Sequence, residues 1–120
     1  MPKVSQPLAR TYNIKSYGGW PKNDGFVTKT RGVLPPGAKL SRIGDDSGRF
    51  VSPKGTPFTQ RSLPRGSERM ATTNYKVVKP IPNWHGQAAP AFGMKGGGMQ
   101  HKLPLSVREL VNSGHLKVAK

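Results

Sequence analysis

The sequence predicts a small single-domain α+β protein with a short, twisted, mostly antiparallel sheet, many loops and a C-terminal helix. Three observations support this fold class. The 15 glycines and 12 prolines fall between short apolar runs and not in one block, which is typical of tight turns joining short strands. Tyr75–Lys79 is rich in β-branched and aromatic residues, which favours a strand. Ser106 and Glu109 have the spacing of a helix capping box.

The first 19 residues show no helical or strand period, and we expect residues 1–19 to be an N-terminal arm or the end of a linker. The domain would then cover residues 20–120, a length that suits one domain.

Four segments follow in this order. Asn23-Asp24-Gly25 predicts a turn, and Phe26–Thr28 predicts a short strand. Leu34-Pro35-Pro36-Gly37 predicts a second turn. Lys39–Gly44 alternates polar and apolar residues, as a half-buried strand does.

Three further segments continue the alternation of strands and turns. Asp45–Gly48 predicts a turn, Arg49–Val51 a short strand and Pro53–Pro57 a loop.

In the second half, the strand at Tyr75–Lys79 ends at Pro80, and residues 81–90 are expected to be a long irregular stretch. Met99–Leu103 predicts another short strand. The helix starts after Ser106, and Gly114 is placed to end it.

The charge is strongly basic. The chain has 20 Lys and Arg against 5 Asp and Glu, a formal net charge of +15, so any polyanion is a candidate partner. The basic residues are spread from Lys3 to Lys120 with no long run, which argues against a basic tail that binds nucleic acid or membrane.

Composition excludes several classes of protein. Without cysteine the chain has no disulfide, thiolate nucleophile or cysteine-ligated zinc. No apolar run is long enough to cross a bilayer, and the first residues lack the apolar core of a signal peptide. We therefore expect no membrane association and no signal peptide in this chain.

Most acidic residues have structural explanations. Turns account for three of them and the helix cap for a fourth, which leaves only Glu68 unassigned and no carboxylate pair for glycosidase chemistry. The three histidines lack metal-ligand spacing, so no metal site is expected. These residues are Asp24, Asp45, Asp46, Glu109, His85, His101 and His115.

Two groups of residues could bind a ligand. Gly93–Gly98 matches neither a Walker A motif nor a dinucleotide fingerprint. Consecutive glycines nevertheless let backbone N–H groups approach a ligand, and Gln100 adds a side-chain amide at the end of the segment. The alternative is that the segment is a plain hairpin loop. Arg49 beside Phe50 joins a forked phosphate donor to an aromatic ring, and Phe58 with Arg61 repeats the pair; the alternative is that each phenylalanine belongs to the core.

Five groups of residues occur in the order of one known family. They are Asn23-Asp24-Gly25-Phe26, Leu34-Pro35-Pro36-Gly37, residues 47–64, Tyr75-Lys76-Val77-Val78-Lys79-Pro80 and residues 89–100. Together they resemble the tuberculosis necrotizing toxin (TNT) domain, from about Trp20 to the C-terminus.

The resemblance implies a secreted toxin domain that hydrolyses NAD, and often NADP, to nicotinamide and ADP-ribose without a cofactor. Such a domain would form the C-terminus of a larger secreted carrier polypeptide and act in the cytosol of a target cell. A cognate immunity protein would block it, and the +15 charge suggests that this partner is acidic.

The resemblance also implies site residues. The family's cleft arginine corresponds to Arg49, with Phe50 beside it, and its catalytic glutamine to Gln100. Either Arg61 or Arg69 would be a second phosphate-binding arginine. Phe58, Gly97 and Gly98 complete the expected substrate-binding set, and Thr73-Asn74 stands where some members have a histidine.

This chemistry agrees with the missing carboxylate pair. Nicotinamide leaves NAD as a neutral molecule from a cationic ring, so no general acid is required. We expect Arg49 and a second arginine to hold the pyrophosphate, Phe50 or Phe58 to pack against nicotinamide, and Gln100 to bind the reacting ribose or orient water.

Two other functions remain open at the level of the sequence. The charge favours a basic nucleic-acid-binding module, of ribosomal type for example, or a nuclease toxin, but the sequence has no RRM, KH, helix-turn-helix or zinc-finger signature. A purely structural interaction domain would show no turnover. The sequence does not decide whether the substrate is NAD or NADP. It also leaves open whether the reaction is hydrolysis, cyclisation or ADP-ribosyl transfer through Glu68.

Overall fold

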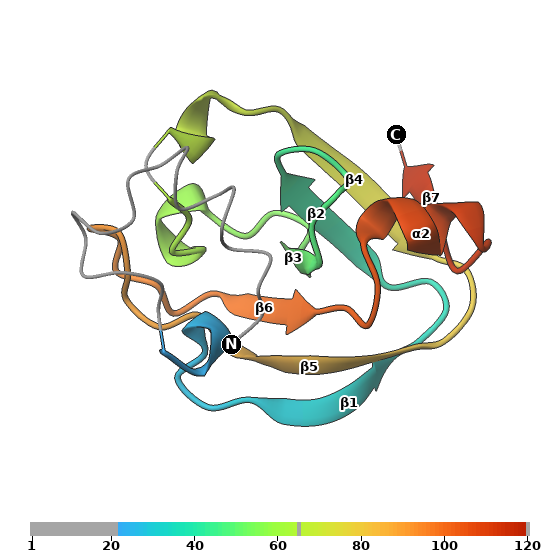
Figure 1. Ribbon diagram of the computed structural model, residues 1–120, viewed down its shortest axis with the longest axis horizontal. Coiled ribbons are helices and arrows are strands. Elements are labelled where there is room, and N and C mark those ends of the chain that lie inside the picture. The colour runs from blue at the N-terminus through green and yellow to red at the C-terminus, as the bar shows by residue number, and fades with distance from the viewer. Residues whose placement is uncertain (1–21, 65, 120) are drawn as a thin grey trace.

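The computed structural model describes residues 22–64 and 66–119 (Figure 1). The strands are β1 (Thr30–Leu34), β2 (Lys39–Ile43), β3 (Phe50–Pro53), β4 (Thr72–Val77), β5 (Ile81–Gln87), β6 (Met99–Lys102) and β7 (Leu116–Ala119). The α-helix is α2 (Val107–Asn112), and the short 3-10 turns are η2 (Lys22–Gly25), η3 (Phe58–Gln60) and η4 (Ser67–Arg69). The strands form one antiparallel sheet in the order β1-β5-β6-β3-β2-β4-β7. The predicted α+β class is confirmed.

The sheet is strongly curved. Leu34 on one edge strand and Leu116 on the other belong to the same buried cluster. Six strand spacings would separate these edges by about 29 Å in a flat sheet, so the sheet must wrap around its core. Figure 1 shows β1, β5 and β6 in one half, with β2 and β4 at an angle in the other. The cluster consists of Leu34, Leu40, Val51, Tyr75, Val77, Ile81, Leu103, Val107, Leu110 and Leu116.

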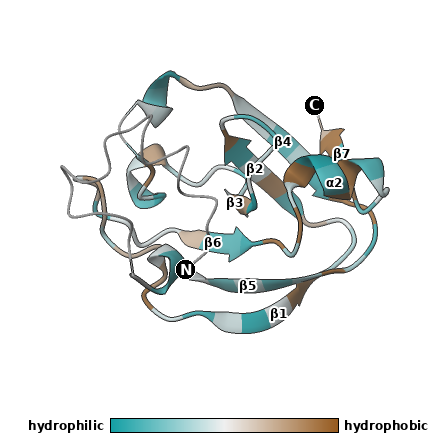
Figure 2. Ribbon diagram, in the orientation of Figure 1, coloured by the Kyte–Doolittle hydropathy of each residue, from teal (hydrophilic) through white to brown (hydrophobic). Residues whose placement is uncertain are grey.

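Helix α2 closes this core next to β7, where Figure 2 shows hydrophobic residues on both elements. The predicted capping box is present, because Glu109 N donates to Ser106 Oγ at 3.1 Å and Ser106 N donates to Glu109 Oε1 at 3.1 Å. Gly114 follows the helix with φ +82°, a left-handed conformation that glycine adopts without strain. The predicted helix and both of its ends are confirmed. No helix within the described residues is long and apolar enough to span a membrane.

The predicted strands at 39–44, 49–51 and 99–103 are confirmed as β2, β3 and β6, and the one at 75–79 begins and ends earlier, as β4. The strand predicted at Phe26–Thr28 is wrong. Phe26 forms only an isolated bridge with Ala88, and the chain becomes extended at β1. The predicted N-terminal arm lies outside the described residues.

The irregular stretch predicted for residues 81–90 is also wrong, since it contains β5, the longest strand of the sheet. Pro82 does not prevent this because β5 pairs with β6 only from Trp84 onward. Gly86 is needed here, since a Cβ at that position would lie 2.0 Å from the Thr28 carbonyl oxygen. Strand β7 has no counterpart in the prediction, and it is held by pairing with β4.

The two faces of the sheet differ in character. In β2, β3 and β6, one face contributes Leu40, Val51 and His101, and the first two of these belong to the core. The alternate residues point to the opposite face, where Ser41, Phe50 and Ser52 lie. Gln100 and Lys102 share this second face, which holds the candidate site.

Candidate active site

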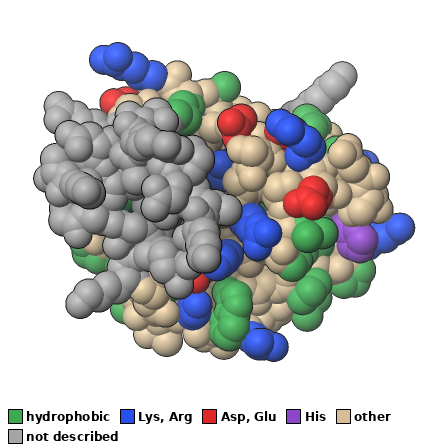
Figure 3. All heavy atoms as spheres, in the orientation of Figure 1, with side chains coloured by type: hydrophobic (Ala, Val, Ile, Leu, Met, Phe, Trp, Pro, Cys, Tyr) green, Lys and Arg blue, Asp and Glu red, His purple; other side chains and the backbone are tan. Residues whose placement is uncertain are grey.

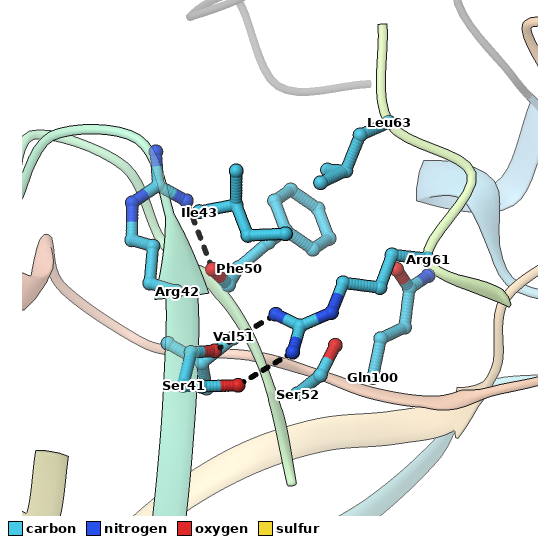
Figure 4. Close-up of a pocket in the computed structure, with 9 residues that line it drawn as sticks. All are labelled: Ser41, Arg42, Ile43, Phe50, Val51, Ser52, Arg61, Leu63 and Gln100. Atoms are coloured by element: carbon cyan, nitrogen blue, oxygen red, sulfur yellow. Dashed lines mark hydrogen bonds between the residues drawn. The ribbon is translucent and has the colours of Figure 1, made fainter. Parts of the chain in front are cut away.

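A small cavity lies on the second face, where β2, β3 and β6 meet the segment that follows η3 (Figure 4). Its volume is about 20 Å³, which is room for about one water molecule, so it forms the floor of a site and does not enclose a nucleotide. The lining residues are Ser41, Arg42, Ile43, Phe50, Val51, Ser52, Arg61, Leu63 and Gln100.

Arg61 carries a buried positive charge, and its side chain points into the cavity (Figure 4). The residue is 7% exposed. Its Nε donates to the Thr56 carbonyl oxygen at 3.0 Å, and its two Nη atoms donate to the Ser41 carbonyl oxygen at 3.5 Å and to Ser41 Oγ at 2.7 Å. No carboxylate within residues 22–64 and 66–119 forms a salt bridge with it.

Burial lowers the pKa of Arg61 from its usual value, although an arginine stays charged at neutral pH. The three hydrogen bonds use three of the five N–H donors of the guanidinium. A buried cation with neutral partners and two remaining donors is suited to binding an anion such as phosphate.

Gln100 is buried beside Arg61. Its Nε2 donates to the Gly25 carbonyl oxygen at 3.1 Å, which fixes the orientation of the amide. The accepting carbonyl belongs to a turn in which Asn23 and Asp24 both have left-handed backbone, with φ of 54° and 55°. The amide oxygen, Oε1, has no hydrogen bond to a described residue and can accept one from a ligand or water.

Asp24 lies in this turn and forms a small ion cluster. Its Oδ2 contacts Lys29 Nζ at 2.9 Å and Lys102 Nζ at 3.1 Å, while Oδ1 is buried without a hydrogen-bond partner. Burial by itself would raise the pKa of this carboxyl, but the hydrogen bonds and charges of the two lysines lower it overall. The sequence explains Asp24 as a turn residue, and it does lie in a turn, but its carboxylate pairs with the two lysines. Asp45 instead accepts a hydrogen bond within its own turn, since Ser47 N donates to its Oδ1 at 3.0 Å.

Phe50 and Arg42 form another side of the cavity. The Phe50 ring packs against the buried ring of Phe26, with centroids 6.3 Å apart. Arg42 Nη1 donates to the Phe50 carbonyl oxygen at 2.9 Å, and its guanidinium covers Gly48. Sequence reasoning missed Arg42 and Ser41, because alternation within β2 shows only that two faces exist and not what each face meets.

Arg49 does not line the cavity that contains Phe50 and Gln100. Its charge acts on Glu109, whose pKa is lowered first by hydrogen bonds from Ser106 and to a smaller extent by Arg49. Arg49 therefore lies toward the start of α2, and its catalytic role stays a prediction.

Two other predicted residues also lie outside the cavity lining. Phe58 is half-buried in η3, and Arg69 is exposed in η4.

The glycine loop packs against η3. The N–H groups of Gly96, Gly97 and Gly98 donate to the carbonyl oxygens of Thr59, Ala88 and Gln60 at 3.2, 2.8 and 3.1 Å. These groups are not free to bind a phosphate, so the predicted approach of the loop N–H groups to a ligand is wrong. Substrate binding by Gly97 and Gly98 stays a prediction without that argument.

The histidines do not join the site. His101 faces His85 with ring centroids 6.1 Å apart, and its Nδ1 is 2.9 Å from Asn83 Oδ1. Burial and the charge of His85 lower the pKa of His101 to about 4. The described residues contain no group of three or more His, Asp or Glu that could hold a metal ion.

Comparison with known proteins gives matches for sequence and for fold. The family described as "Tuberculosis necrotizing toxin" matches residues 33–118. The conidial surface nicotinamide adenine dinucleotide glycohydrolase nadA of Aspergillus fumigatus is 32% identical over 112 residues, covering 82% of this chain and 48% of that protein. The chain thus spans about half the length of this curated relative.

Among solved structures, tuberculosis necrotizing toxin in complex with its immunity factor IFT has a TM-score of 0.68 and 26% identity, covering 82% of this chain and 60% of that one. Rhs1-CT in complex with its cognate immunity protein RhsI1 has a TM-score of 0.57 and 18% identity, covering 92% and 90%. The second similarity shows the fold alone.

Proposed function

Because the chain belongs to the tuberculosis necrotizing toxin family, we propose that it is a secreted toxin domain that hydrolyses NAD or NADP to nicotinamide and ADP-ribose. The similarity to an NAD glycohydrolase supports this activity. The observation that carries the proposal is the buried guanidinium of Arg61, which has no carboxylate partner among the described residues and lies beside Gln100 in one cavity.

In this proposal, Arg61 holds the pyrophosphate through its two remaining N–H donors. Its place in the cavity favours it over Arg69 as the second phosphate-binding arginine. Phe50 packs against the nicotinamide ring at the mouth of the same cavity.

The bond between nicotinamide nitrogen and ribose C1′ breaks, and its electron pair leaves with nicotinamide, which becomes neutral. Water adds to C1′ and releases a proton to solvent. Gln100 accepts a hydrogen bond at Oε1 from the attacking water or from a ribose hydroxyl, because its Nε2 is already bound to Gly25. Neither a general acid nor a cofactor is required for these steps.

The proposal extends to partners and location. The +15 charge suits fast association with an acidic immunity protein. On the face shown in Figure 3, Lys and Arg side chains are spread over the described residues. Similarity to a toxin that was solved with its immunity factor supports such a partner. We further propose that a larger secreted polypeptide carries the domain and that it acts in the cytosol of a target cell.

The test is the loss of NAD and release of nicotinamide by the purified protein in metal-free buffer with EDTA. Gln100→Ala should lower turnover at least a hundredfold, about the loss measured for other single transition-state hydrogen bonds. Gln87→Ala is the matched control, since Gln87 is an exposed glutamine on β5 and should leave turnover unchanged. A folded wild-type protein that leaves NAD and NADP intact would overturn the proposal.

A further inference from the structure

Four side chains form a continuous row across the sheet. Arg31 on β1 stands opposite Trp84 on β5, Trp84 stands opposite Lys102 on β6, and Lys102 stands opposite Phe50 on β3. Directly opposite residues of antiparallel strands project from the same face. We call these four residues the basic-aromatic row. Since Phe50 also lines the cavity, the row runs from the cavity to the edge strand β1.

Trp84 forms a platform with two cations. Lys29 Nζ lies 5.0 Å and Arg31 Cζ lies 4.8 Å from the centroid of its ring. The indole is half-buried and Arg31 is exposed, so the platform is held by the sheet and open to solvent. An indole with a stacked guanidinium offers flat surfaces to a planar base and N–H donors to its edges.

The row and the residues in contact with it have an excess of positive charge. Lys29, Arg31 and Lys102 contribute three cations, and Asp24 contributes one carboxylate that contacts both lysines. The local charge is therefore about +2, and the ammonium groups are held in place by a buried residue. Fixed cations beside an aromatic ring form a site for an anionic, ring-containing ligand.

The length of the row limits what this ligand can be. Phe50 and Arg31 are separated by three strand spacings, about 14 Å. Trp84 lies two strand spacings from Phe50, about 10 Å. A ligand that has one ring against Phe50 and a second ring on the guanidinium of Arg31 must therefore span about 14 Å, which suits an extended dinucleotide. A mononucleotide with its ring against Phe50 would contact only the first part of the row.

Resting on the proposed function, we propose that the basic-aromatic row binds the adenosine half of the substrate. The purine stacks on the platform of Trp84 and Arg31, and a phosphate of the same half lies against Lys102. The row thus adds an adenosine subsite to the site at the mouth of the cavity, where the nicotinamide end reacts.

Kinetics of variants test this proposal. Trp84→Ala should raise KM for NAD about tenfold, the order expected for loss of one base-stacking ring, and leave kcat within about twofold because the contact is equally strong before and during reaction. Trp84→Phe should restore most of the affinity. Arg31→Ala should also raise KM, while Lys117→Ala, which removes the same charge from β7 at the other edge of the sheet, should not. An unchanged KM in Trp84→Ala, or equal changes of KM in Arg31→Ala and Lys117→Ala, would refute the proposal that the basic-aromatic row binds the adenosine half.

A binding measurement separates this inference from the proposed function. The chain has two tryptophans, so Trp20→Phe leaves Trp84 as the single indole fluorophore. Adding ADP-ribose should quench its fluorescence, with weaker binding in Trp20→Phe/Arg31→Ala. Absence of quenching in a protein that hydrolyses NAD would refute the subsite and keep the activity. Quenching in a protein that hydrolyses neither dinucleotide would support the subsite and refute the activity.

Discussion

The substitution Asp24→Asn should weaken both the fold and the reaction, because one buried carboxylate serves both. It holds Lys29 and Lys102 at 2.9 and 3.1 Å. The next residue, Gly25, supplies the carbonyl oxygen that fixes Gln100 Nε2. Asparagine keeps the shape of the side chain but removes its charge.

The size of the effect follows from burial. The Asp24 side chain is 6% exposed, and those of Lys29 and Lys102 are 29% and 16% exposed. Breaking a buried ion pair by removing one partner costs about 3–5 kcal/mol. We expect about 2–3 kcal/mol here, because the lysines can turn toward water and asparagine still accepts one hydrogen bond. For a domain of this size, that lowers Tm by about 10 °C or more.

Thermal unfolding at pH 7 measures this loss, and Asp46→Asn is the matched control. Asp46 pairs with Arg108 at 2.7 Å, but those side chains are 41% and 61% exposed, so the loss of Tm should be much smaller than in Asp24→Asn. Equal losses of stability in the two variants would refute the reasoning from burial.

Acid should remove the same contribution from the wild type. The pKa of Asp24 is lowered in the folded state, so its stabilising effect is present above the unfolded pKa of 3.8 and disappears as pH falls through the lower, folded value. The stability difference between wild type and Asp24→Asn should therefore be constant near neutral pH and shrink below about pH 4. A difference that grows on acidification would contradict this assignment.

Three further substitutions test the site and its support. Arg61→Lys keeps the charge but loses the forked donor, so it should lower kcat/KM for NAD at least tenfold. Arg69→Lys, at an exposed position, should change kcat/KM less than twofold. Equal values of kcat/KM in the two variants would remove Arg61 from the site. Gly98→Ala would place a Cβ 2.7 Å from Thr56 Cγ2 and 2.9 Å from the Gln60 carbonyl oxygen. Denaturant unfolding should therefore show a loss of about 1–3 kcal/mol in the free energy of unfolding. An unchanged free energy would mean that the glycine loop is not packed against η3 as described. Ser106→Ala breaks the capping box and should cost about 1 kcal/mol in the same assay, with NAD turnover unchanged at a temperature where the protein stays folded.

Features encoded by neighbouring residues were predictable from the sequence. The capping box of α2 needs only residues three apart, and its prediction is confirmed. The same holds for the turn at Asp45 and for the alternating strand β2. Phe50 and Gln100 were also predicted as site residues, through motif order, and the cavity contains both.

Features that depend on distant partners were not predictable in this way. Strand β5 contains Pro82 and Gly86, which locally disfavour a strand, and it forms because β1 and β6 pair with it on both sides. Asp24 has the local pattern of a turn residue, and only the folded chain brings Lys102 to its carboxylate.

The sequence by itself determined the fold class, the helix, most of the turns and two of the residues that line the cavity, because each rests on local propensity or on a motif within a short stretch. Only the tertiary structure decided which arginine lines that cavity. Arg49 and Arg61 both stand near a phenylalanine in the sequence, but packing buries Arg61 against Ser41 and leaves Arg49 toward α2. The physical reason is that burial and charge pairing depend on the three-dimensional neighbours of a residue, which the curvature of the sheet selects.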